Sequence, residues 1–123
     1  MSTAPIPVAV IVGSTREGRF GDTVARWFVS RVRRRADVAL DVIDLAVLCL
    51  PAVHTALPGP VERAFARRVR GAEAFVTITP EYNHAYPASL KFALDCVKEE
   101  WSRNQWRSFH TAASRAACER WSR

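Results

Sequence analysis

Residues 7–22, PVAVIVGSTREGRFGD, decide the fold of this chain. An apolar, mostly β-branched run ends at Gly13, and a helical pattern begins near residue 21. Strand, glycine-containing loop and helix in this order leave free backbone N–H groups at a helix N-terminus, where an anion binds. Hydroxyl and guanidinium groups in the same loop suit a phosphate; they belong to Ser14, Thr15, Arg16 and Arg19. We therefore predict a phosphate-binding loop between the first strand and the first helix.

The rest of the chain alternates between strand and helix patterns. We predict strands over residues 6–13, 38–45 and 72–79, helices over residues 21–35, 60–70 and 88–101, and a long loop over residues 46–59. Asp22 is the expected cap of the first helix. This alternation predicts an α/β fold with a doubly wound parallel sheet, which binds ligands at the carboxyl ends of its strands. The loops at residues 13–21 and 80–87 should then lie at the same edge.

Composition and charge narrow the classes of function. A chain of 123 residues with net charge +6 forms one domain. No apolar run reaches the ~20 residues of a membrane span, and no export signal is evident. The three cysteines show no metal-site or disulfide spacing, so we expect reduced thiols, a cytoplasmic location and no metal. The arginines of residues 31–35 lie where a helix ends, which favours a solvated face over a nucleic-acid site, the weaker alternative.

The second loop, PEYNHAYP at residues 80–87, carries aromatic, amide and acidic side chains. Such groups sandwich a planar heterocycle and bond to its edge. Glu81 and His84 alternatively form a general acid–base pair. No serine or cysteine nucleophile with a base is evident, so hydrolase chemistry is disfavoured. We therefore predict a binding loop and name no catalytic side chain.

The two stretches GSTREGRFGDTVARWF and TPEYNHAYPASLKFALD together resemble the NADPH-dependent FMN reductase family of flavodoxin-like proteins, over about residues 5–101. The resemblance implies an FMN-dependent NAD(P)H oxidoreductase that passes a hydride from NADPH or NADH, through FMN, to a small acceptor such as a flavin or a quinone. It implies a homodimer or homotetramer. It also implies an FMN phosphate in the first loop and the flavin ring against the second loop. The residues that match are, for the phosphate, Ser14, Arg16, Phe20 and Gly21, and for the ring, Pro80, Glu81, Tyr82 and Asn83.

Two positions depart from the family pattern, in which many members have an asparagine where this chain has Gly21 and a serine where it has Arg19. A guanidinium there would substitute through its charge, so Arg19 joins the predicted phosphate contacts. Two alternatives to the enzyme remain: a non-catalytic flavodoxin-like carrier of FMN, and an inactive, truncated remnant.

The last stretch, residues 104–123, does not continue the pattern of residues 1–103. A flavodoxin-like sheet has five strands, and about three are evident here, because the tail shows no strand pattern. Codons read one base earlier permit K-P-V-A at residues 104–107 and V-V-S-Y-G-G-V-S-G-G-L-R at residues 108–119, which is the missing family segment. We hypothesise that a frameshift produced the tail. The alternative is a genuine short variant whose segment SRAACERW forms a helix.

Overall fold

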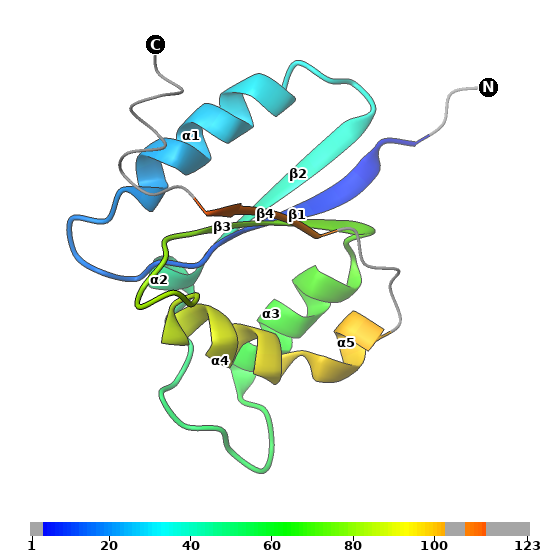
Figure 1. Cartoon of the computed structure of the whole chain (residues 1–123). Coiled ribbons are helices and arrows are strands. Elements are labelled where there is room, and N and C mark those ends of the chain that lie inside the picture. The colour runs from blue at the N-terminus through cyan, green and yellow to red at the C-terminus, as the bar shows by residue number, and fades with distance from the viewer. Residues whose placement is uncertain (1–3, 103–107, 113–123) are drawn as a thin grey trace.

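A computed structural model describes residues 4–102 and 108–112, which form a four-stranded parallel sheet in the order β2-β1-β3-β4 (Figure 1). The strands are β1 (Ile6–Val12), β2 (Val38–Asp44), β3 (Ala74–Thr79) and β4 (Ser108–Ala112). The helices are α1 (Gly21–Val32), α2 (Leu45–Leu48), α3 (Pro60–Arg70), α4 (Ala88–Cys96) and α5 (Lys98–Ser102). The flavodoxin-like doubly wound α/β class is confirmed, and every strand pairing is parallel.

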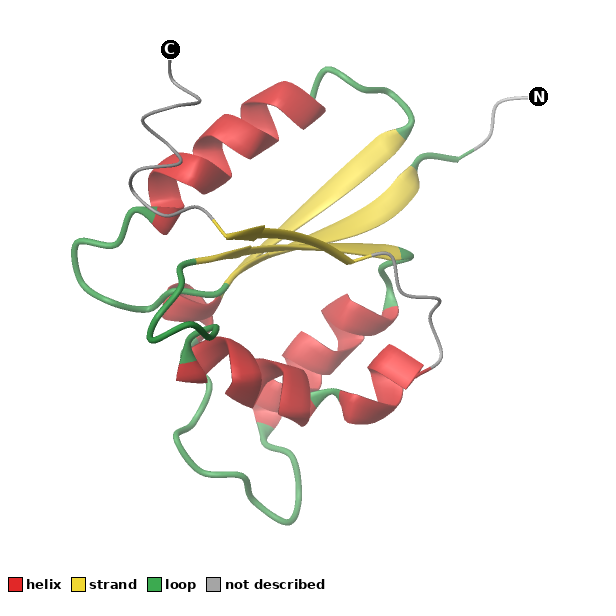
Figure 2. Cartoon of the chain, viewed as in Figure 1, coloured by secondary structure: helices red, strands yellow, loops and turns green. Residues whose placement is uncertain are grey.

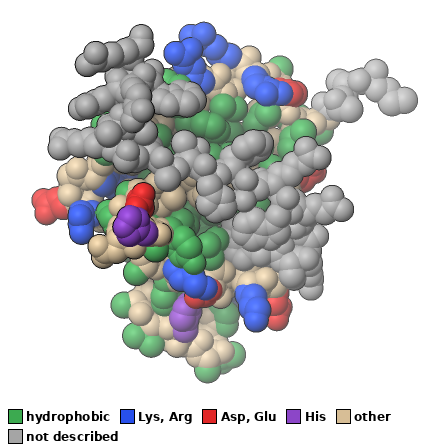
Figure 3. Space-filling model, viewed as in Figure 1, with side chains coloured by type: hydrophobic (Ala, Val, Ile, Leu, Met, Phe, Trp, Pro, Cys, Tyr) green, Lys and Arg blue, Asp and Glu red, His purple; other side chains and the backbone are tan. Residues whose placement is uncertain are grey.

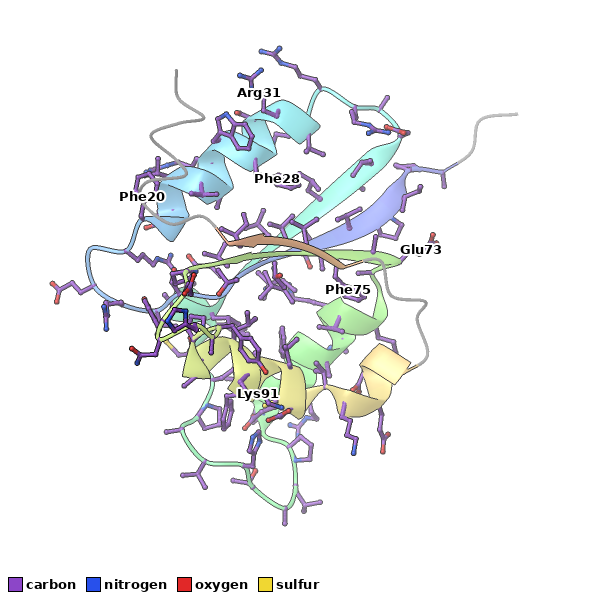
Figure 4. All side chains as sticks on the ribbon, in the orientation of Figure 1. Phe20, Phe28, Arg31, Glu73, Phe75 and Lys91 are labelled. Atoms are coloured by element: carbon purple, nitrogen blue, oxygen red, sulfur yellow. The ribbon has the colours of Figure 1, made fainter. Side chains whose placement is uncertain are left out.

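The helices cover both faces of the sheet, with α1 on one face and α3, α4 and α5 on the other (Figures 1 and 2). Side chains of β1 alternate between two apolar cores because successive residues of a strand point to opposite faces. Ile11 packs toward α3 and α4 with Phe75, whereas Val12 packs toward α1 with Phe28 (Figure 4). Coverage on both faces explains why β1 is continuously apolar.

The strands differ from their predicted bounds by one or two residues, and the helices differ from the prediction at three places. The first helix ends at Val32, earlier than expected. The predicted loop at residues 46–59 begins inside the short helix α2, which forms because the Asp44 carboxylate accepts a hydrogen bond from the Ala46 N–H at 3.0 Å. The predicted helix over residues 88–101 is two helices, because Val97 leaves the helical region with φ −124° and ψ 35°.

The expectation that the tail contains no strand is wrong at residues 108–112. There β4 pairs in parallel with β3, in a register that aligns Phe75 with Ser108 and Thr79 with Ala112. A strand edge offers a row of unpaired N–H and C=O groups, and pairing with them overrides weak β-propensity. The predicted helix within SRAACERW lies outside the described residues.

Candidate functional site

Both predicted binding loops lie at the carboxyl edge of the sheet, after β1 and after β3. Gly13 N–H donates to the Ile78 carbonyl at 2.8 Å, which joins the ends of the two strands. The Arg16 guanidinium carbon lies 4.7 Å from the centre of the Tyr82 ring, within the range of a cation–π contact. Ser89, at the start of α4, donates its hydroxyl to the Gly13 carbonyl at 2.6 Å. The prediction that the loops share one edge is therefore confirmed.

Ser14 is the buried centre of the first loop. The residue is 2% exposed, and its Oγ is the buried side-chain polar atom that lacks a hydrogen-bond partner among residues 4–102 and 108–112. Gly21 lies against this oxygen, and a Cβ on Gly21 would be 2.6 Å from Ser14 Oγ. Buried hydroxyls without partners are costly. The loop therefore holds a preformed polar group that a ligand can satisfy.

The N-terminus of α1 faces the same loop. No side chain caps this helix, and the described part of the chain provides no hydrogen-bond acceptor for the N–H groups of Phe20, Gly21 and Asp22. Asp22 is therefore not the cap that the sequence predicted; it lies in the first turn, and its carboxylate pairs with Arg19 at 2.5 Å. Free N–H groups and the positive end of the helix dipole favour an anion at this point.

Arg19 turns inward instead of toward solvent. Its guanidinium donates to the Ser14 carbonyl at 2.5 Å, to both carboxylate oxygens of Asp44 at the end of β2, and to Asp22. The hydrogen bond to Asp44 raises the pKa of Arg19. The same bond lowers the pKa of the Asp44 carboxyl below its ordinary value, against the opposing effect of desolvation. Whether Arg19 also contacts a phosphate stays a prediction.

The second loop is a tight turn with an unusual backbone. Tyr82 and Ala85 exchange two hydrogen bonds of 2.8 and 3.1 Å, and the turn residues Asn83 and His84 have φ of 52° and 63°. Two left-handed residues in a row give the two-residue turn that closes a hairpin. Glu81 Oε1 lies 3.3 Å from His84 Nδ1, and the His84 side chain is 98% exposed. An acid–base role for this pair stays a prediction.

Most of the predicted residues lie near Ser14, whereas some of those in the second loop are exposed to solvent. The first loop supplies Ser14, Arg16 and the backbone of Phe20 and Gly21, and Tyr82 reaches it from the second loop. Pro80 is partly buried, whereas Glu81 and Asn83 are exposed on the turn. Sequence reasoning missed Asp44 and Ser89. A carboxylate at the carboxyl end of a predicted strand was a usable signal for Asp44, whereas no feature of the sequence indicated Ser89.

Metal-binding groups, membrane spans and positively charged patches among the described residues would also indicate a function. The described residues contain no group of three or more His, Cys, Asp or Glu side chains arranged to hold a metal ion. Within the same residues, no helix combines the length and the apolar character of a membrane span. On the face that Figure 3 shows, Lys and Arg side chains lie in several separate places, with a group over α1.

Fold and geometry together describe a doubly wound α/β protein in which a buried, unpartnered hydroxyl and an uncapped helix N-terminus lie beside an aromatic loop at the carboxyl edge of the sheet. The model of the NADPH-dependent FMN reductase family matches residues 6–119, and the chain belongs to this family. An NAD(P)H-dependent FMN reductase of Schizosaccharomyces pombe is 33% identical over 106 residues, covering 77% of this chain and 52% of the relative. A 2-hydroxy-1,4-benzoquinone reductase of a Burkholderia species is 32% identical over 102 residues, covering 82% and 55%.

Solved structures agree on the fold. The flavoenzyme NAD(P)H:(acceptor) oxidoreductase FerB from Paracoccus denitrificans superposes with a TM-score of 0.69 at 24% identity, over 85% of this chain and 59% of that one. The chain spans about half the length of the curated relatives it matches.

Proposed function

We propose that this protein binds FMN and acts as an NAD(P)H-dependent oxidoreductase toward a small acceptor such as a flavin or a quinone. One observation carries the proposal: the partnerless buried hydroxyl of Ser14 and the free N–H groups of α1 meet in one loop. The contact between Arg16 and Tyr82 sets that loop beside the second one. The names of the relatives, an FMN reductase and a benzoquinone reductase, support the substrate class.

The residues of the first loop fit a phosphate monoester. A phosphate oxygen would accept hydrogen bonds from Ser14 Oγ and from the N–H groups of Phe20 and Gly21. The absence of a Cβ on Gly21 keeps open the space next to that hydroxyl. Arg16 is exposed and forms no ion pair with the described residues, so its charge is available to a ligand. These groups would hold the charged end of the cofactor.

The second loop would hold the flavin ring, in our proposal against Pro80, Glu81, Tyr82 and Asn83. The hairpin bonds between Tyr82 and Ala85 fix the shape of this loop before a ligand binds. When bound, FMN supplies the hydride-accepting and electron-donating chemistry, and the protein binds and orients it. We assign no catalytic side chain.

A spectroscopic experiment tests the proposal against its two alternatives. The purified protein is titrated with FMN, and its visible spectrum is recorded before and after anaerobic addition of NADPH or NADH. An oxidoreductase binds FMN, gains thermal stability from it and loses the flavin absorbance with NAD(P)H. A carrier binds FMN but reacts slowly with NAD(P)H. A protein that neither binds FMN nor gains stability contradicts the proposal.

We further propose a cytoplasmic protein that forms a homodimer or homotetramer and has no nucleic-acid, membrane or metal partner. For the tail, we propose that residues 104–123 follow a frameshift and that residues 1–103 are the reductase-like part. The position of β4 supports this, since it occupies residues 108–112, where the alternative frame spells V-V-S-Y-G. Sequencing the coding DNA tests it: a preceding frame that does not encode K-P-V-A and the segment after it refutes the frameshift.

A further inference from the structure

Arg19 connects three separate pieces of the site through its two terminal nitrogens. Nη1 donates to the Ser14 carbonyl at 2.5 Å and to Asp44 Oδ1 at 2.6 Å. Nη2 donates to Asp22 Oδ1 at 2.5 Å and to Asp44 Oδ2. The guanidinium thereby joins the start of the phosphate loop, the first turn of α1 and the carboxyl end of β2.

This arrangement does not suit a direct phosphate ligand. All four hydrogens on the terminal nitrogens already have acceptors, and only 10% of the Arg19 side chain is exposed. Two carboxylates surround one guanidinium, so the three side chains together carry a net negative charge. A phosphate reaching the terminal nitrogens of Arg19 would have to displace Asp22, Asp44 or the Ser14 carbonyl, and Asp44 is held in a bidentate pair, which is among the stronger ion-pair geometries.

We propose that Arg19 is a positioning residue: by anchoring the loop to Asp44, it holds Ser14 and the N-terminus of α1 in the shape that receives the phosphate. This inference rests on the proposed FMN site. The bond from Arg19 to the Ser14 carbonyl fixes the peptide that carries the buried hydroxyl. The bond to Asp22 fixes the helix end that supplies the free N–H groups. Order established before binding removes part of the entropy cost of binding.

The substitution Asp44→Asn distinguishes positioning from direct contact by the sign of its effect. If Arg19 were a phosphate ligand restrained by Asp44, removing the carboxylate charge would release the guanidinium and tighten FMN binding. If Arg19 positions the loop, the weakened anchor raises the Kd for FMN, by about tenfold for the loss of a charge-assisted bond. Asparagine is also a good helix cap, so α2 is preserved.

Two further measurements separate loop positioning from a general loss of structure. Riboflavin lacks the phosphate, so its Kd should change less than twofold in Asp44→Asn and in Arg19→Lys, while the Kd for FMN rises in both. Both substitutions break the same anchor, so their effects should not add. The Kd for FMN of the double variant Arg19→Lys/Asp44→Asn should be no more than about twofold above that of whichever single variant has the higher Kd.

Arg68→Met is the matched control, because Arg68 also forms a bidentate pair, with Asp41 at 2.6 and 2.9 Å, between α3 and β2. Its loss should leave the Kd for FMN unchanged. The positioning role is overturned if Asp44→Asn lowers the Kd for FMN, or if it raises the Kd for riboflavin as much as the Kd for FMN. Neither result contradicts the proposed FMN site. A wild-type protein that does not bind FMN overturns both.

Discussion

Replacing Ser14 with alanine should move stability and cofactor affinity in opposite directions. The substitution removes one oxygen that is buried and has no hydrogen-bond partner among the described residues. An unsatisfied buried hydroxyl costs about 1–3 kcal/mol. The free energy of unfolding of the FMN-free protein should therefore rise by about 1 kcal/mol, the lower end of that range, in Ser14→Ala.

The same oxygen should be needed once the phosphate arrives. A hydrogen bond to a charged group contributes about 1.5–3 kcal/mol, so Ser14→Ala should raise the Kd for FMN by about 10- to 150-fold. Urea unfolding followed by tryptophan fluorescence gives the first quantity, and quenching of FMN fluorescence gives the second. Sites that are pre-formed for a ligand commonly exchange stability for function in this way.

Ser89→Ala is the matched control for Ser14→Ala. Ser89 lies at the same edge, but its hydroxyl already donates to the Gly13 carbonyl at 2.6 Å. Its removal should lower the free energy of unfolding by about 0.5–1.5 kcal/mol. If Ser14→Ala also destabilises the FMN-free protein, or leaves the Kd for FMN within twofold of wild type, the hydroxyl is not held ready for a phosphate.

Three further predictions concern the same loop. Gly21→Ala should raise the Kd for FMN about tenfold, because the new Cβ would lie 2.6 Å from Ser14 Oγ and turn it aside. The free energy of unfolding should change little, because alanine favours the helix. A Kd for FMN equal to that of the wild type would contradict this prediction. Arg16→Ala should weaken FMN binding about tenfold and make it less dependent on salt, as titrations at two ionic strengths would show; unchanged affinity places the phosphate elsewhere. Arg19 lowers the pKa of Asp44 in the folded state. This pair therefore contributes stability above about pH 4 that is lost as the pH falls further. Urea unfolding from pH 6 to pH 3 should show a smaller decrease in the free energy of unfolding in Arg19→Met than in the wild type, and an identical decrease would refute the linkage.

Much of the fold could be predicted because its patterns are local. The run from Val8 to Val12 is apolar because helices cover both faces of β1. Helix α3 begins at Pro60 and ends just before Gly71, which is its C-cap. The two binding loops were evident for the same reason, since each consists of neighbouring residues after a strand. Strand β4 was missed because its pairing depends on the free edge of β3 and not on its own residue types.

The sequence alone determined the strand–loop–helix unit, the parallel sheet and the chemical nature of the two loops. Only the tertiary structure decided which partners each side chain has, because these contacts join residues that are distant in the sequence. The sequence predicts that Arg19 is a phosphate ligand. In the structure its main partner is Asp44, which lies 25 residues away at the end of another strand. Ser14 reads as one hydroxyl among several until folding buries it without a partner. Residue types set which interactions are available, and the packing of the strand ends selects among them.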